Sequence, residues 1–152
     1  VVAAALGFLC LNFPPARVFM GDAGSVPLGF LAGAIGLTGW LQYAWPVWFP
    51  LLAFSPFVVD ASATLMKRVL RRERFWQAHR DHYYQRLVRM GWSHRRLALV
   101  EYALMGACGG SALGLLHAGL ALQVLGLWVW IAAYATVMLL IDRCWAKRGD
   151  SA

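Results

Sequence analysis

The chain has 152 residues, of which 61% are hydrophobic and 14% are charged, and its mean hydropathy is +0.57. A core of this size cannot bury so much apolar surface, which excludes an ordinary soluble domain and indicates a membrane protein. The formal net charge of +7 is typical of proteins that contact nucleic acid, anionic membrane surfaces or acidic substrates. The position of the basic residues has to decide between these partners.

Residues 1–11 form an apolar run that is too short to cross a bilayer alone, and we interpret it as the end of a longer helix. The run begins without an initiator Met or a basic leader. We therefore expect residues 1–152 to be a single membrane domain, the C-terminal part of a longer protein.

A polar island follows at residues 12–25, with the sequence Asn-Phe-Pro-Pro-Ala-Arg-Val-Phe-Met-Gly-Asp-Ala-Gly-Ser. Its two prolines stop a helix, and the glycines on either side of Asp22 allow a tight turn. A carboxylate on such a turn, where a helix begins, suits a metal or phosphate site. The same pattern fits an Asp22 or Ser25 that only caps the next helix, and the local pattern leaves both interpretations open.

This motif resembles the signature of the polyprenyl-phosphate N-acetylhexosamine-1-phosphate transferases, of the glycosyltransferase family 4 type. These integral membrane enzymes include the muramoyl-pentapeptide transferase and the enzymes that begin O-antigen and teichoic acid linkage units. The positions that match without a gap are Asn12, Pro15, Ala16, Val18, Phe19, Met20, Gly21, Asp22, Gly24 and Ser25. The resemblance implies that Asp22 is catalytic and binds Mg²⁺, with Mn²⁺ as an alternative ion, and that Asn12 is a supporting substrate contact.

Four apolar segments follow the motif, and they predict an all-α polytopic membrane bundle with about four complete transmembrane helices plus the end of a fifth. Small residues in the first segment would allow a neighbouring helix to approach closely. Three prolines in the second predict a kinked or broken helix. The four segments are residues 26–41, 44–66, 97–116 and 120–141.

Residues 67–96 form the main polar loop and hold ten of the fourteen Lys and Arg residues. By the positive-inside rule this loop is cytoplasmic, which also places residues 12–25 and the tail 142–152 inside. The turns at 42–43 and 117–119, which lack charged residues, then lie outside. This topology accounts for the basic charge through the lipid bilayer, without nucleic acid. The three scattered cysteines indicate neither a disulfide framework nor a zinc site.

The basic loop contains the segment Ala-His-Arg-Asp-His-Tyr-Tyr-Gln-Arg-Leu at residues 78–87. A helix over residues 75–90 would place His79, His82 and Arg86 on one face, where they could hold a diphosphate. The alternative is a basic loop that orients the protein and touches anionic lipid head groups. Orientation requires Lys and Arg, however, and not His.

The segment resembles the histidine-rich cytoplasmic loop with which the same family contacts the sugar nucleotide, in the form found in its O-antigen or capsule branch. The resemblance implies that His82 is catalytic and that His79, Arg80 and Arg86 bind the substrate. Asp60 is an additional substrate-binding candidate, because an ionisable group at membrane depth is costly and the family tends to carry an Asp here. Asp60 would orient a site residue or pair with an Arg. We interpret Asp142 only as an end-of-helix charge.

The expected reaction transfers an N-acetylhexosamine 1-phosphate from a UDP-N-acetylated aminosugar to undecaprenyl phosphate. It would begin lipid-linked O-antigen, capsule or related envelope glycans at the cytoplasmic face of the bacterial inner membrane. The family's adjacent Asp-Asp pair is not in these residues, so we expect it upstream and expect the 152-residue chain alone to be inactive. The alternative is a non-catalytic membrane module or part of a transporter, with Asp60 and the prolines marking a substrate path. A homodimer is compatible with the sequence, which does not decide the oligomeric state.

Overall fold

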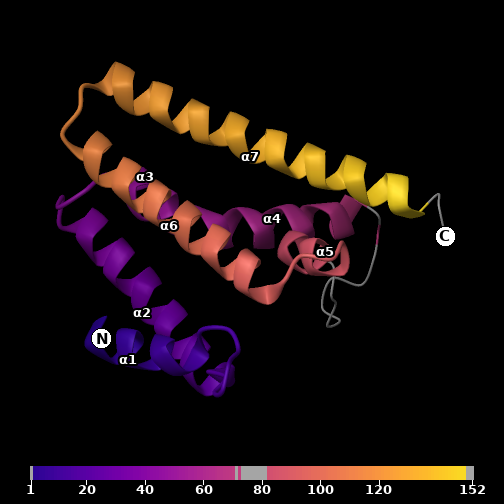
Figure 1. Ribbon diagram of the computed structural model, residues 1–152. Coiled ribbons are helices and arrows are strands. Elements are labelled where there is room, and N and C mark those ends of the chain that lie inside the picture. The colour runs from indigo at the N-terminus through magenta and orange to yellow at the C-terminus, as the bar shows by residue number, and fades with distance from the viewer. Residues whose placement is uncertain (1, 71, 73–81, 150–152) are drawn as a thin grey trace.

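The computed structural model describes residues 2–70, 72 and 82–149 (Figure 1). Within these residues the secondary structure is entirely helical. The helices are α1 (Val2–Asn12), α2 (Gly21–Leu41), α3 (Trp48–Ala53), α4 (Ser55–Leu70), α5 (Tyr83–Arg89), α6 (His94–Leu116) and α7 (Leu120–Gly149). The predicted loop at 12–25 is shorter than expected, because α2 already begins at Gly21.

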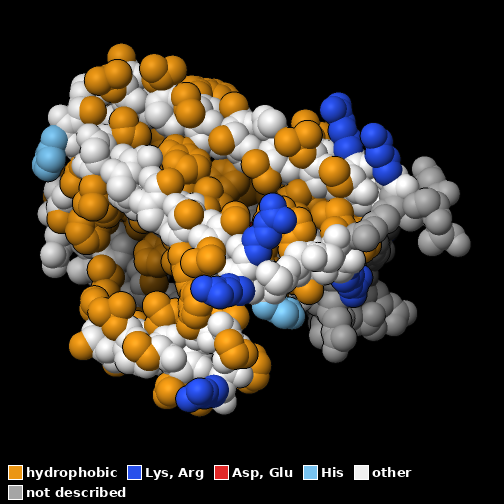
Figure 2. All heavy atoms as spheres, viewed as in Figure 1, with side chains coloured by type: hydrophobic (Ala, Val, Ile, Leu, Met, Phe, Trp, Pro, Cys, Tyr) orange, Lys and Arg blue, Asp and Glu red, His pale blue; other side chains and the backbone are white. Residues whose placement is uncertain are grey.

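The bundle has two distinct ends. The α2–α3 and α6–α7 connections lie together at one end, which we call the turn end, and residues of both line a common hollow. The loop of residues 13–20, helix α5 and the C-terminal part of α7 lie toward the opposite end, which we call the basic end (Figure 1). Figure 2 shows the Lys and Arg side chains of this face toward the basic end, and mostly hydrophobic side chains elsewhere. The two connections that were predicted to lie outside thus meet at one end, and the side of the membrane that this end faces stays a prediction.

Three helices of the described residues are long and apolar enough to cross a membrane: α2, α6 and residues Leu120–Lys147 of α7. Their apolar stretches are almost entirely exposed, with none of the α7 stretch buried inside the protein. Helices that are apolar all round and unburied need a lipid environment. The chain is therefore a polytopic helical membrane protein, as predicted.

The second predicted segment, residues 44–66, is not one continuous spanning helix. It divides into α3, of 6 residues, and α4, of 16 residues, with Phe54 between them. Pro56 lacks an N–H group, so it cannot donate the helical bond to the carbonyl of residue 52. The predicted break is confirmed, and in place of the second expected span the structure has a pair of shorter helices.

Two glycines of α2 allow close packing against the turn after α2 and against α3. The indole Nε1 of Trp45 donates a hydrogen bond to the carbonyl oxygen of Gly36 at 3.1 Å. A Cβ atom at Gly39 would lie 2.0 Å from the ring of Trp45, and one at Gly36 would lie 3.0 Å from Pro50 Cβ. The predicted small-residue contact is therefore real at the C-terminal half of α2. At Gly29 and Gly33 an added Cβ would meet nothing within 4 Å among the described residues.

Three polar side chains join α4, α6 and α7 in the interior. The hydroxyls of Ser55 and Tyr134 lie 2.8 Å apart, and the fully buried Cys108 sulfur lies 3.3 Å from Ser55 Oγ and 3.2 Å from Tyr134 Oη. In a membrane such interhelical hydrogen bonds replace contacts that lipid cannot provide. This cluster fixes the mutual register of the three helices.

Replacing Cys108 by leucine is expected to destabilise the bundle by about 1–3 kcal/mol, because the larger side chain must enter a fully packed site. The measurement is the thermal unfolding midpoint of the purified complete protein in detergent. Cys144→Leu is the matched control, since Cys144 is exposed on α7. Equal midpoints for the two variants would contradict the packing described for Cys108.

Candidate active site

Asp22 lies in the first turn of α2, directly after the loop of residues 13–20. The loop is closed at its base by the side chain of Asn12, whose Nδ2 donates to the carbonyl oxygen of Val18 at 2.9 Å. Gly21 follows with φ +60°, a left-handed conformation that favours glycine and turns the chain into the helix. Asn12 and Gly21 together determine where α2 begins and hence where Asp22 stands.

Asp22 does not cap α2. The N-cap residue is Met20, whose side chain makes no capping hydrogen bond. The exposed Asp22 follows two positions later, where a carboxylate interacts favourably with the positive end of the helix dipole. The capping alternative left open by the motif is thus removed, and an accessible carboxylate remains.

The second group of site candidates is arranged by α5. The predicted continuous helix over residues 75–90 is wrong at His82, which is extended, with φ −61° and ψ 147°, and precedes a helix of only seven residues. Asp60 of α4 is the physical reason, because its Oδ1 accepts the backbone N–H of Tyr83 at 2.9 Å and so begins the helix there. His79 and Arg80 lie outside the described residues.

Asp60 also contacts the imidazole of His82. Its Oδ2 lies 3.4 Å from His82 Nδ1, and about a quarter of each side chain is exposed (27% for His82 and 21% for Asp60). The imidazole ring also stacks on Tyr84, with ring centroids 5.7 Å apart. A carboxylate at Nδ1 favours a proton on that nitrogen and fixes the orientation of the ring. Asp60 therefore holds both α5 and His82.

Arg86 faces the interior of the bundle. Arg86 is only 9% exposed, and its Nη1 lies 3.0 Å from Asp142 Oδ1 of α7. Its guanidinium packs over the rings of Tyr83 and Trp145. Asp142 also pairs with Lys67 of α4. The interpretation of Asp142 as a simple end-of-helix charge is wrong, because its carboxylate joins three helices.

The structure brings Asp60 and His82 together at the start of α5 and places Asn12 and Asp22 at the start of α2. Both groups lie toward the basic end (Figure 1). The Arg86 side chain does not join His82 as predicted, because it pairs with Asp142 in the interior. Within the described part of the chain, no three His, Cys, Asp or Glu side chains form a metal-binding group. Asp22 offers one exposed carboxylate, so a Mg²⁺ ion there would need substrate phosphates and ligands beyond the described residues.

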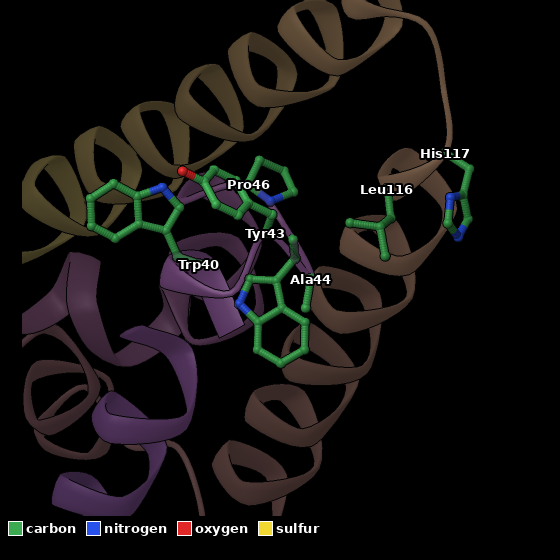
Figure 3. A pocket seen from close by; sticks show the side chains of 7 residues that line it. Trp40, Tyr43, Ala44, Pro46, Leu116 and His117 are labelled. Atoms are coloured by element: carbon green, nitrogen blue, oxygen red, sulfur yellow. The ribbon is translucent and has the colours of Figure 1, made fainter. Parts of the chain in front are cut away.

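A hollow of about 370 Å³ lies at the turn end and is not part of this site. Figure 3 shows side chains from the two connections around the hollow. Leu116 and His117 come from the end of α6, and the other residues come from the end of α2 and the turn that follows it. The lining residues are Trp40, Tyr43, Ala44, Trp45, Pro46, Leu116 and His117. Its aromatic rings are the residues expected at a membrane–water interface.

The fold and the exposed carboxylate at the basic end define the class of protein, a multi-pass membrane protein with polar groups gathered at one face. Residues 1–40 match the family model described as glycosyl transferase family 4. The chain belongs to this family.

Curated relatives agree with this assignment. One is a probable undecaprenyl-phosphate N-acetylglucosaminyl 1-phosphate transferase of Bacillus subtilis (strain 168), 32% identical over 106 residues, which cover 68% of this chain and 30% of the relative. Another is a decaprenyl-phosphate N-acetylglucosaminephosphotransferase of Mycolicibacterium smegmatis (strain ATCC 700084 / mc(2)155), 30% identical over 158 residues, covering 94% and 39%. A phospho-N-acetylmuramoyl-pentapeptide-transferase of Desulforudis audaxviator (strain MP104C) is 32% identical over 123 residues, covering 75% and 35%.

The chain spans about a third of the length of these curated relatives (30%, 39% and 35%). Their names share a transfer of a sugar phosphate and differ in the sugar, so they support the family and its general reaction, and no particular branch. No solved structure matches the chain.

Proposed function

We propose that the complete protein transfers an N-acetylhexosamine 1-phosphate from a UDP-sugar to undecaprenyl phosphate and releases UMP. The observation that supports the proposal is that the loop of residues 13–20 and helix α5, which His82 precedes, lie toward the same end of the bundle (Figure 1). Two relatives are named as transferases of N-acetylglucosamine phosphate to undecaprenyl or decaprenyl phosphate, which supports the same class of reaction.

In this reaction an oxygen of the lipid phosphate attacks the donor phosphorus that carries the sugar. The bond from that phosphorus to the bridging oxygen breaks, and the bridging oxygen leaves with UMP. Both reactants are anions, so catalysis depends on positioning and on neutralising charge. A bound Mg²⁺ would supply that neutralisation by coordinating the donor diphosphate.

The residues of this chain then take separate roles. Asp22 contributes its exposed carboxylate as one Mg²⁺ ligand, and Asn12 holds the loop that leads to it. His82, oriented by Asp60, contacts the donor, as His79 and Arg80 are proposed to do. The exposed apolar helices form the path for the lipid chain.

The basic end is proposed to face the cytoplasm of a bacterial inner membrane, because Lys and Arg gather there and because UDP-sugars are cytoplasmic. The product would begin a lipid-linked O-antigen, capsule or related cell-envelope glycan.

The test uses membranes that contain the complete protein, undecaprenyl phosphate, Mg²⁺ and a panel of radiolabelled UDP-N-acetylated sugars. We expect one or a few donors to give a labelled lipid and an equal amount of UMP. His117→Asn, at the turn end, is the control variant that should retain the activity. Absence of lipid-linked product and UMP with every donor would refute the proposal.

A further inference from the structure

We infer that Asp142, in the C-terminal part of α7, is a positioning residue that sets the place of α5 and thereby of His82. The inference rests on the proposed function, in which His82 contacts the sugar-nucleotide donor. It starts from the length of α5, which has only seven residues. A helix of that length is unstable alone, so its position must come from contacts with its neighbours.

Two residues of α5 are buried, and both contact the same carboxylate. Arg86 Nη1 lies 3.0 Å from Asp142 Oδ1, and Tyr83 Oη donates to Asp142 Oδ2 at 3.3 Å. These residues are 9% and 6% exposed, respectively. The carboxylate of Asp142 is therefore the polar partner of the whole buried side of α5.

Lys67 connects this contact to α4. Its Nζ pairs with Asp142 Oδ2 and lies 4.6 Å from the centre of the Tyr83 ring. Tyr83 and Arg86 are thus enclosed by a cation from α4, an anion from α7 and the ring of Trp145. Without the charge of Asp142, the cations of Lys67 and Arg86, both close to the Tyr83 ring, would lose the carboxylate that they share, and the buried guanidinium would lose its counter-ion.

His82 immediately precedes this anchored helix, and its other support is Asp60 at 3.4 Å. The imidazole is therefore fixed by Asp60 directly, while its backbone is placed through Tyr83 and Arg86 by Asp142. A shift of α5 of the order of 1 Å would misplace His82 against a bound donor, and such misplacement is costly for transfer reactions.

The test compares Asp142→Asn with Arg143→Gln in the complete protein, because Arg143 is the exposed neighbour on α7. Two quantities are measured: the donor KM and kcat, and hydrogen exchange of the α5 amides. We expect Asp142→Asn to raise the donor KM by about 10-fold or more, with faster exchange in α5. Arg143→Gln should change neither quantity, and Asp142→Glu, which keeps the charge, should recover most of the KM. If Asp142→Asn does not accumulate, Tyr83→Phe removes only the hydroxyl that contacts Asp142 and is read in the same way.

Unchanged exchange in α5 would overturn the inference, as would equal effects of Asp142→Asn and Arg143→Gln. Faster exchange with an unchanged KM for Asp142→Asn, while His82→Asn does raise the KM, would overturn the positioning role alone. If neither Asp142→Asn nor His82→Asn changes the donor KM, the donor contact of His82 is refuted, and with it the proposed function of this residue.

Discussion

Replacing Asp22 by asparagine in the complete protein is expected to lower the rate of UMP release by about 10²–10³-fold, the typical loss when one group that stabilises transferring charge is removed. Asparagine keeps the size and one oxygen of the side chain but loses the charge that Mg²⁺ prefers. Since Met20 and not Asp22 is the N-cap of α2, the substitution leaves the start of the helix unchanged. The measurement is UMP release as a function of Mg²⁺ concentration.

The control for Asp22→Asn is the thermal midpoint of the same protein, which should change little because Asp22 is exposed. Loss of activity with an unchanged midpoint would locate the effect in the reaction. Full activity of Asp22→Asn at every Mg²⁺ concentration would reduce Asp22 to a favourable charge beside a helix dipole, a role worth only about 0.3–1 kcal/mol.

Asp60→Asn is expected to reduce kcat/KM for the donor by about 10–100-fold, as is typical when the partner that orients a functional histidine is removed. In the unmodified protein Asp60 Oδ1 lies 2.9 Å from the backbone nitrogen of Tyr83, and Asp60 Oδ2 lies 3.4 Å from His82 Nδ1. The asparagine amide can still accept the N–H of Tyr83, but it places no negative charge beside His82. Asp60→Ala removes both contacts, so it should also lower the free energy of unfolding by ~1 kcal/mol through the lost helix cap.

Steady-state kinetics and thermal midpoints of the two Asp60 variants separate these roles. Ser62→Ala, at an exposed position of α4, is the matched control. A variant Asp60→Asn with normal kinetics would mean that the carboxylate only begins α5. If both Asp60 variants lose kcat/KM equally and in proportion to a lowered thermal midpoint, the effect is one on folding.

The class of fold could be predicted from the sequence, because apolar segments, interrupting prolines and the distribution of Lys and Arg are local properties of the chain. The three prolines of residues 44–66 predicted a break that the structure places at Phe54. The start of α2 was predicted five residues too late, since a glycine such as Gly21 is as compatible with a turn as with a helix start.

The arrangement around α5 could not be predicted, because it depends on residues far apart in the sequence. A charge near the end of a helix has no visible partner in a single sequence, so nothing indicated that Asp142 would meet Arg86 and Lys67. The expected helix over 75–90 failed at His82 for the same reason, since Asp60 begins α5 from a neighbouring helix. Whether Asp22, His82 and the other candidates bind substrate stays a prediction.

The anchoring of α5 to both α4 and α7 has a mechanical consequence. Because α4 and α7 both hold this one short segment, we expect a change in the tilt of α7 to shift the residues of α5. Helix tilt responds to the thickness of the surrounding hydrocarbon layer. We therefore expect the geometry of the polar face to depend on the acyl-chain length of the host lipid.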